Sequence, residues 1–386
     1  MIAREMAKEL VALTREYPVV TLLGPRQAGK TTLAKMTLSG YAYCNLELPD
    51  VREFAQRDPR AFLAQYPGRV ILDEIQRVPD LLSYIQDIVD QEHLNGRFVL
   101  TGSHQLRVRE AIGQSLAGRT AILTLLPLSL AEIETAGQSL GGFAECAFRG
   151  FLPRIHAEDL RPSVAYANYY QTYVERDVRQ LIHLKDAATF EKTMKLMAGR
   201  TGQLFDASSL ANDVGVDAKT IRNWLSILEA SFILFKLPPF FENFGKRAIK
   251  SPKYYFTDVG LLCYLLGIRK PEQVLRDPLV GAIFENLAVG ECLKAQTNRG
   301  QAPELYFFRD SNGNEVDLMA IEGRTLHAAE IKSAATFSMD MLKGLRRFRS
   351  VAGSAGRSLV IYAGENRKLS DGFEAVSFRQ ARRLVE

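Results

Sequence analysis

The sequence predicts an α/β fold: a parallel α/β sheet comes first, a mainly helical part follows, and a second α/β part ends the chain. From Tyr17 to Leu126, five short apolar runs alternate with helix-like segments. From about Phe148 to Leu266, helical periodicity replaces the strand runs, and from Asp277 onward the order reads helix, strand, strand, strand, helix, strand. We therefore expect three domains, at residues 1–148, 149–276 and 277–386.

Composition narrows the class of protein. The chain has 386 residues, of which 47% are hydrophobic and 24% charged, a balance typical of globular proteins. Its net charge of +5 is compatible with a nucleic-acid surface without requiring one. The four cysteines lie far apart, and no apolar run approaches the roughly 18 residues that span a membrane. We expect a cytoplasmic protein without a membrane anchor.

The five apolar runs of the first domain are continuous and do not alternate with polar residues. Such runs, bounded by turn-forming residues, are typical of strands buried on both faces of a parallel sheet. They are VVTLL (residues 19–23), AYCNL (42–46), RVILD (69–73), RFVLT (97–101) and AILTL (121–125).

A phosphate-binding motif follows the first run directly. GPRQAGKT, residues 24–31, fits the pattern G-x-x-x-x-G-K-[ST], with a strand before it and a helical segment after it. Backbone N–H groups at a glycine-rich turn and a helix N-terminus form a concave anion site. We expect Lys30 to reach the β- and γ-phosphates of ATP and Thr31 to hold Mg²⁺. The predicted ATP-binding residues are Gly24, Pro25, Arg26, Gln27, Ala28, Gly29, Lys30, Thr31 and Thr32.

The third run delivers two acidic residues at its carboxyl end, where the sites of α/β sheets lie. Asp73 is expected to assist Mg²⁺, and Glu74 to orient and activate the attacking water. The pair indicates hydrolysis of ATP and not transfer to another substrate. An acidic helix cap after a strand is the alternative reading.

Two further segments complete the predicted ATPase site. Ser103 and His104 stand at the tip of the fourth strand, and one of them, preferably Ser103, is expected to contact the γ-phosphate or the water, as a polar sensor residue does in AAA+ proteins. An arginine supplied by a neighbouring subunit would stabilise transition-state charge. Of Arg107, Arg109 and Arg119 we choose Arg119 for this role.

The helical part contains a candidate helix-turn-helix. Helices are expected at Ser208 to Asp213 and at Ala218 to Ala230, with Asp217 capping the second, and the strand FILFKL would complete a winged-helix shape. The exposed residues of the second helix, which suit contacts with phosphates or base edges, are expected to include Lys219, Thr220, Arg222 and Asn223. The same unit could instead pack protein against protein.

The C-terminal part combines carboxylates with a lysine. Glu285 lies on an expected helix, Asp317 on one strand, and Glu330 with Lys332 on the next, where a period of two puts both side chains on one face. Carboxylates around Mg²⁺ with a nearby lysine would activate water against a phosphodiester, as in PD-(D/E)xK nucleases. Charged residues at these spacings are also common by chance. The following helix carries Lys343, Arg346, Arg347 and Arg349, which could follow a nucleic-acid backbone or form a solvated face.

Taken together, these segments resemble a widespread group of prokaryotic AAA ATPases with a C-terminal restriction-endonuclease-like domain. The resemblance covers nearly the whole chain and is carried by GPRQAGKTTL, VILDEIQ, LTGSH, LAGRT, LLPLSLAEI, YVERDV, KYYFTDVGLLCYLLG, FENL, YFFRDSNGNEVDL and EIKS. It implies ATP binding at Gly29, Lys30 and Thr31, and hydrolysis through Asp73 and Glu74. It also implies an endonuclease-like site at Glu285, Asp317, Glu330 and Lys332.

Three functions remain open from the sequence. The first is an ATP-driven, ring-forming protein, such as a hexamer, that acts on duplex or branched DNA. The second is a nucleotide switch that assembles with protein partners and uses the C-terminal domain only for docking. The third is an ATP-dependent protein unfoldase, for which the sequence offers no pore loop or protease-docking tail.

Overall fold

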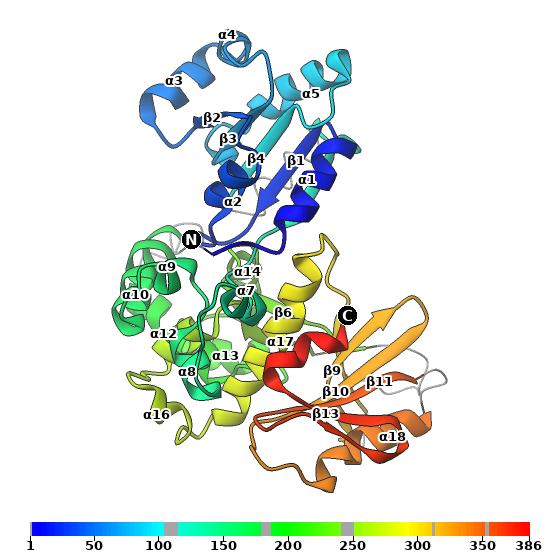
Figure 1. The fold of residues 1–386 in the computed structure, drawn as a ribbon. Helices are drawn as coiled ribbons and strands as arrows, with labels where there is room; N and C mark the ends of the chain where they lie inside the picture. The colour runs from blue at the N-terminus through cyan, green and yellow to red at the C-terminus, as the bar shows by residue number, and fades with distance from the viewer. Residues whose placement is uncertain (1, 104–114, 179–186, 241–250, 311–312, 352–354) are drawn as a thin grey trace. The chain divides into compact units, whose positions relative to one another are not determined.

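The structure is a computed structural model that describes residues 2–103, 115–178, 187–240, 251–310, 313–351 and 355–386 (Figure 1). It divides into two compact units. Unit 1 comprises Met1–Leu128, Ala230–Phe232 and Thr297–Gln301, and unit 2 comprises Ser129–Glu229, Ile233–Gln296 and Ala302–Glu386. Among the described residues, no helix is both long and apolar enough to span a bilayer.

Unit 1 contains a five-stranded parallel sheet in the order β2-β3-β4-β1-β5. All five strands that the sequence predicts are present: β1 (Val19–Leu23), β2 (Ala42–Asn45), β3 (Val70–Asp73), β4 (Phe98–Gly102) and β5 (Thr120–Thr124). The three central strands are buried along their whole length, but β2 and β5 are partly exposed. The prediction of burial on both faces is therefore wrong for β2 and β5, which lie at the two edges of the sheet.

Unit 1 also contains helices among its described residues. They are α1 (Ala7–Glu16), α2 (Lys30–Thr37), α3 (Pro49–Arg57), α4 (Pro59–Ala64), the short η1 (Ile75–Arg77) and α5 (Leu81–Glu92). One core joins Leu10 of α1 and Leu33 of α2 to apolar residues of the central strands. Because β1, β3 and β4 run parallel, their carboxyl ends lie on the same side of the sheet, and the segments that follow Leu23, Asp73 and Gly102 begin there. All three strand ends that the sequence marks as functional therefore meet there.

Unit 2 begins with the helical part. Its elements are α7 (Leu130–Thr135), α8 (Phe143–Arg149), α9 (Pro153–Ala157), α10 (Pro162–Tyr169), η2 (Tyr170–Val178), α12 (Ala187–Gly199), α13 (Ala207–Val214), α14 (Ala218–Ala230), β6 (Leu234–Leu237), β7 (Lys253–Phe256), α15 (Val259–Leu265) and α16 (Pro271–Val274). The predicted helix-turn-helix is α13 and α14, and β6 pairs with β7 antiparallel. Gly215, with φ of 91°, ends α13, and the Asp217 carboxylate accepts the Thr220 N–H at 2.9 Å at the start of α14.

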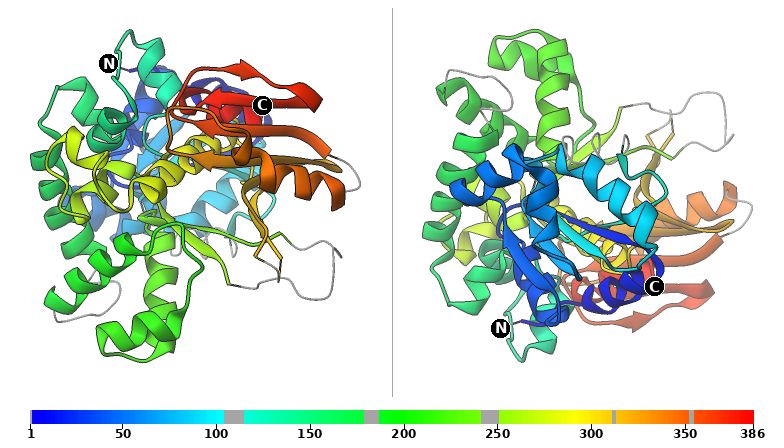
Figure 2. Two further views of the ribbon diagram at one scale, coloured as in Figure 1. Left: turned by 90° about the horizontal axis from the view of Figure 1, so that it is seen from below. Right: turned by 90° about the horizontal axis from the view of Figure 1, so that it is seen from above.

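The C-terminal part of unit 2 is a six-stranded mixed sheet in the order β12-β13-β11-β10-β9-β8. Its elements are α17 (Val280–Thr297), β8 (Leu305–Arg309), β9 (Glu315–Glu322), β10 (Thr325–Lys332), η3 (Met339–Leu342), α18 (Lys343–Val351), β11 (Ala355–Tyr362), β12 (Arg367–Lys368), η4 (Ser370–Gly372), β13 (Phe373–Ser377) and η5 (Phe378–Leu384). The predicted succession of helix, three strands, helix and strand is found in α17 to β11. The sequence did not predict β12 and β13, which extend the sheet. Helix α18, drawn in orange, packs on the sheet through Leu345 and Phe348 (Figure 2).

Candidate functional site

The backbone of residues 24–31 has the shape that a phosphate needs. Gly24 has φ of 153°, and a Cβ built there would lie 2.0 Å from the Leu125 carbonyl oxygen, so only glycine fits. Gly29, with φ of 88°, precedes α2 and has no side chain to cap the helix. No side chain at position 29 therefore accepts a hydrogen bond from the first N–H groups of α2. An anion can bind at a helix N-terminus because such N–H groups are available to it. These residues fit a bound triphosphate.

Lys30 is buried within the same turn. Its Nζ donates hydrogen bonds to the carbonyl oxygens of Gly24 and Pro25, both at 2.9 Å. Burial lowers the pKa of Lys30 to about 8, while Glu74 and Asp73 oppose that shift. A phosphate oxygen at this turn would offer the ammonium a charged acceptor in place of neutral carbonyls.

Asp73, at the end of β3, accepts hydrogen bonds from three hydroxyl groups. Thr31 Oγ1 donates to both carboxylate oxygens, at 2.9 and 3.0 Å, and Tyr43 OH donates at 2.9 Å. The third donor is Thr101 Oγ1, from the end of β4. The predicted pair of Thr31 and Asp73 is thus brought together, and the oxygen donor set suits Mg²⁺. Tyr43 and Thr101 were not predicted, since their proximity follows from strand order.

Glu74 has a backbone conformation that non-glycine residues rarely adopt. Its φ of 60° and ψ of 48° lie in the left-handed region, which costs about 1–3 kcal/mol and often accompanies a functional constraint. Its carboxylate accepts hydrogen bonds from Ser103 Oγ, at 3.1 Å, and from Gln76 Nε2. Ser103, predicted as a sensor, therefore lies beside the predicted base.

Arg119 forms a bidentate ion pair within unit 1. Its Nε lies 2.5 Å and its Nη2 2.8 Å from the two carboxylate oxygens of Asp90. No hydrogen bond of Arg119 within the described residues reaches the phosphate-binding turn. The other candidates for these roles, His104, Arg107 and Arg109, lie outside the described residues.

In unit 2, Asp317, Glu330 and Lys332 are brought together. Lys332 Nζ lies 2.9 Å from an Asp317 oxygen and 2.7 Å from a Glu330 oxygen, and the Ile331 N–H donates to Asp317 at 2.8 Å. This juxtaposition is the one that the strand pattern predicts. The residues can bind a divalent cation through two carboxylates if Lys332 moves aside.

Glu285 is instead held by residues of β7. It accepts hydrogen bonds from Tyr255 OH at 2.5 Å and from Lys253 Nζ at 3.1 Å, and Lys253 Nζ also lies 2.6 Å from Glu315. Among the described residues, no three His, Cys, Asp or Glu side chains are arranged to hold a metal ion, so Glu285 does not join Asp317 and Glu330 in a group of three ligands. The sequence showed no sign of Lys253, which is distant in the chain from both of its partners.

We call the cluster formed by these charged side chains the C-terminal centre; its members are Lys253, Glu285, Glu315, Asp317, Glu330 and Lys332. The charges of this centre shift the pKa values of several of its members. Burial raises the pKa of Glu330 to about 8, and the nearby Asp317 carboxylate adds to the increase. Burial also acts to raise the pKa of Asp317, but Lys332 and Lys253 outweigh it and lower that pKa. Burial raises the pKa of Glu285, against the opposing effect of Lys253. Glu330 and Glu285 therefore bind a proton more readily than an ordinary carboxyl group, and Asp317 binds one less readily.

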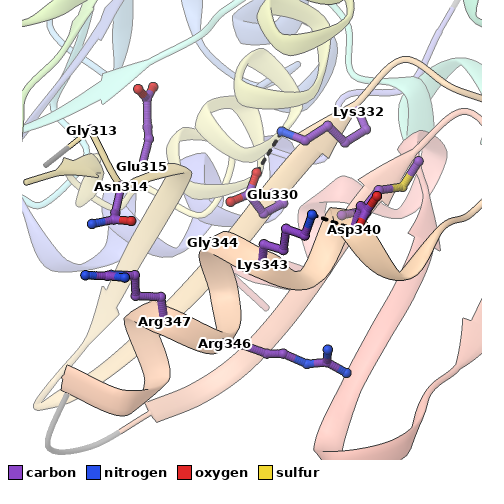
Figure 3. Close-up of a pocket in the computed structure, with 11 residues that line it drawn as sticks. Gly313, Asn314, Glu315, Glu330, Lys332, Asp340, Lys343, Gly344, Arg346 and Arg347 are labelled. Carbon is purple, nitrogen blue, oxygen red and sulfur yellow. Dashed lines mark hydrogen bonds and ion pairs between the residues drawn. The ribbon is translucent and has the colours of Figure 1, made fainter.

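An open cavity of about 730 Å³ adjoins Glu330 and Lys332 (Figure 3). Lys343, Arg346 and Arg347 line it from α18, where positions i, i+3 and i+4 share one face, and all three are exposed. Arg349 lies elsewhere and donates to Ser358 Oγ at 3.1 Å. The expected row of four cations is thus a group of three.

The sheet order and the phosphate-binding geometry of unit 1 define an AAA-type P-loop ATPase. A family model described as an AAA domain matches residues 16–134. Models described as domains of unknown function match residues 141–272 (DUF8612) and 280–381 (DUF4143).

Comparison of whole chains shows the family. The chain is 33% identical over 381 residues to the uncharacterized proteins Rv2008c of Mycobacterium tuberculosis and Mb2031c of Mycobacterium bovis, covering 97% of this chain and 83% of each relative. It belongs to the same protein family as these two. Among solved structures, it is similar to the Walker-type ATPase PABY2304 of Pyrococcus abyssi, with 13% identity, a TM-score of 0.42, and coverage of 68% of this chain and 94% of that one.

Proposed function

We propose that this ATPase hydrolyses ATP with Mg²⁺ and couples hydrolysis to DNA that unit 2 binds. In unit 1, Lys30 binds the β- and γ-phosphates, and Thr31 and Asp73 hold Mg²⁺. The metal supplies positive charge to the phosphate oxygens. The Glu74 carboxylate releases Gln76 and Ser103 and then orients the attacking water. Ser103, once released, contacts the γ-phosphate.

Assembly into a ring, such as a hexamer, would complete this site. Arg119 leaves Asp90 and reaches the γ-phosphate bound by the neighbouring subunit, where it stabilises transition-state charge. The exposure of the Arg119 side chain, 34%, supports this role because the guanidinium is accessible at the surface.

DNA binding is assigned to α14 and α18 of unit 2. The exposed residues Lys219, Arg222 and Asn223 of α14 suit phosphate and base-edge contacts. Thr220 is half-buried and its hydroxyl donates to Asp217 at 2.6 Å, so we assign it to the helix cap and not to DNA. The proposal depends above all on the three cations of α18 beside the centre of Glu330 and Lys332.

A matched pair of double variants tests the coupling. Arg346→Ala with Arg347→Ala should abolish stimulation of ATP hydrolysis by DNA and reduce the salt dependence of DNA binding, because two phosphate contacts are lost. The control is Arg367→Ala with Lys368→Ala, which removes two exposed cations from β12 of the same sheet. Equal DNA stimulation in both variants and the wild type would refute the coupling.

We further propose that Asp317, Glu330 and Lys332 form a Mg²⁺-dependent endonuclease site. The test is cleavage of linear, forked and four-way DNA with Mg²⁺, with and without ATP. Lys332→Ala should abolish cleavage, because the lysine polarises the phosphodiester.

The second candidate function is a nucleotide switch that docks protein partners through a silent C-terminal domain. It is favoured by one observation: Lys253 and Lys332 already neutralise the carboxylates of the centre. In that case the wild type cleaves none of the DNAs, and Lys332→Ala changes neither ATP hydrolysis nor its response to DNA.

A further inference from the structure

Two lysines contact the carboxylates of the C-terminal centre, and each connects two of them. Lys332 of β10 lies within 2.9 Å of Asp317 and Glu330. Lys253 of β7 lies 3.1 Å from Glu285 and 2.6 Å from Glu315. The two ion-pair groups have the same form, but they come from different parts of unit 2.

Exposure separates the two lysines. The Lys332 side chain is 39% exposed, so its ammonium can move into water when a cation enters. The Lys253 side chain is only 4% exposed, and its Nζ also lies 5.3 Å from the centre of the Phe307 ring. A buried ammonium that leaves its carboxylates loses their attraction without regaining hydration, so Lys253 stays in place.

The partners of Lys253 are themselves held by other groups. The side chain of Asn286 connects α17 to β7, since it accepts the Phe256 N–H and donates to the Phe256 carbonyl oxygen, both at 2.8 Å. This keeps Glu285 against β7, where Tyr255 also donates to it. Glu315 has a second cation, Arg309, at 2.9 Å.

We propose that Lys253 is the fixed counter-cation of this centre. It occupies Glu285 and Glu315 and thereby restricts the centre to one divalent cation, bound at Asp317 and Glu330. Glu285 is then a partner of Lys253 and not a metal ligand, in contrast to the assignment that the sequence suggests. This inference rests on the cation site of the proposed nuclease.

Mn²⁺ binding to the full chain, without nucleotide, tests the assignment directly. The Asp73→Asn background removes the predicted metal ligand of unit 1, and electron paramagnetic resonance of free Mn²⁺ counts the bound ions. We expect one bound Mn²⁺, weakened more than about 10-fold by Asp317→Asn, as loss of a ligand does, and less than about 2-fold by Glu285→Gln.

Variants at position 253 provide the second measurement. Lys253→Met should expose Glu285 and Glu315 to cations and allow a second Mn²⁺ to bind, whereas Lys253→Arg should retain one because it keeps the positive charge. A merely structural role would lower thermal stability without changing the number of bound ions. If Lys253→Met does not fold, the Mn²⁺ affinity of Glu285→Gln and the number of Mn²⁺ ions bound by Lys253→Arg still test the proposal.

Three results would overturn the inference: two Mn²⁺ ions bound to the Asp73→Asn chain with no other change, no Mn²⁺ ion bound to it, or equal weakening by Glu285→Gln and Asp317→Asn. Failure of the proposed nuclease is visible separately, because cleavage of DNA is measured without reference to Mn²⁺ stoichiometry.

Discussion

Raising the pH should weaken nucleotide binding at the phosphate-binding turn of unit 1. Burial lowers the pKa of Lys30 from 10.5 to about 8, so the ammonium loses its proton in an accessible range. A triphosphate binds the protonated form, and its negative charge raises the pKa of Lys30 in the complex. Affinity is therefore full below the pKa of the free protein and falls as pH rises through it.

The size of the effect follows from that pKa. One unit above the pKa about a tenth of the free protein still carries the charge, so the dissociation constant at about pH 9 should be about 10-fold larger than at about pH 7. Calorimetric titration with a non-hydrolysable ATP analogue over this range measures it. Circular dichroism at each pH confirms that the fold persists.

Lys30→Met is the matched control for this titration. It removes the titrating group, so its weaker binding should change little over the same pH range. A wild-type affinity that stays constant or rises with pH would refute the assignment of this pKa to the phosphate contact.

Three further predictions concern single residues. Glu74→Gln should leave binding of the ATP analogue unchanged but lower kcat for phosphate release by about 10²- to 10⁴-fold, and a similar kcat would exclude Glu74 as the base. Gly24→Ala should lower the free energy of unfolding in urea by about 3 kcal/mol, because the new Cβ would meet a carbonyl oxygen. Gly118→Ala is the control: with φ of 74° and nothing within 4 Å of the new Cβ, it should lower the free energy of unfolding by about 1 kcal/mol. Equal losses in the two variants would contradict the steric argument. Lys253→Met should lower the free energy of unfolding by about 3–5 kcal/mol because it leaves the buried Glu285 carboxylate without its cation. Lys332→Met should lower it by about 1 kcal/mol since that lysine is more exposed, and thermal melts would check this order.

The strands of unit 1 and the helix-turn-helix of unit 2 were predictable because their signals are local. An apolar run such as residues 19–23 and a cap such as Asp217 act over a few neighbouring residues. The exposure of β5 was not predictable, because its position at the edge depends on where β1 pairs. The strand β13 was missed for a similar reason, since its place in the sheet depends on its pairing with β11, and β12 in turn pairs with β13.

In the candidate sites, too, local motifs were predictable from the sequence and long-range contacts were not. Lys30 and Thr31 could be predicted, since they belong to one contiguous motif. Tyr43 could not, because its hydroxyl reaches Asp73 only when β2 lies beside β3. Glu285 was assigned to the nuclease-like site through the family resemblance, and only the structure shows that it faces Lys253.

By itself, the sequence determined the strands of unit 1, the helix-turn-helix helices and the phosphate-binding turn, because the apolar runs, helix caps and glycine torsions that specify them act between near neighbours. Tertiary structure alone decided that Lys253 pairs with Glu285 and Glu315. These residues are far apart in the chain but lie a few ångströms apart in the fold. Coulomb attraction in an interior of low dielectric constant depends on the distance between two charges in space and not on their separation in the sequence.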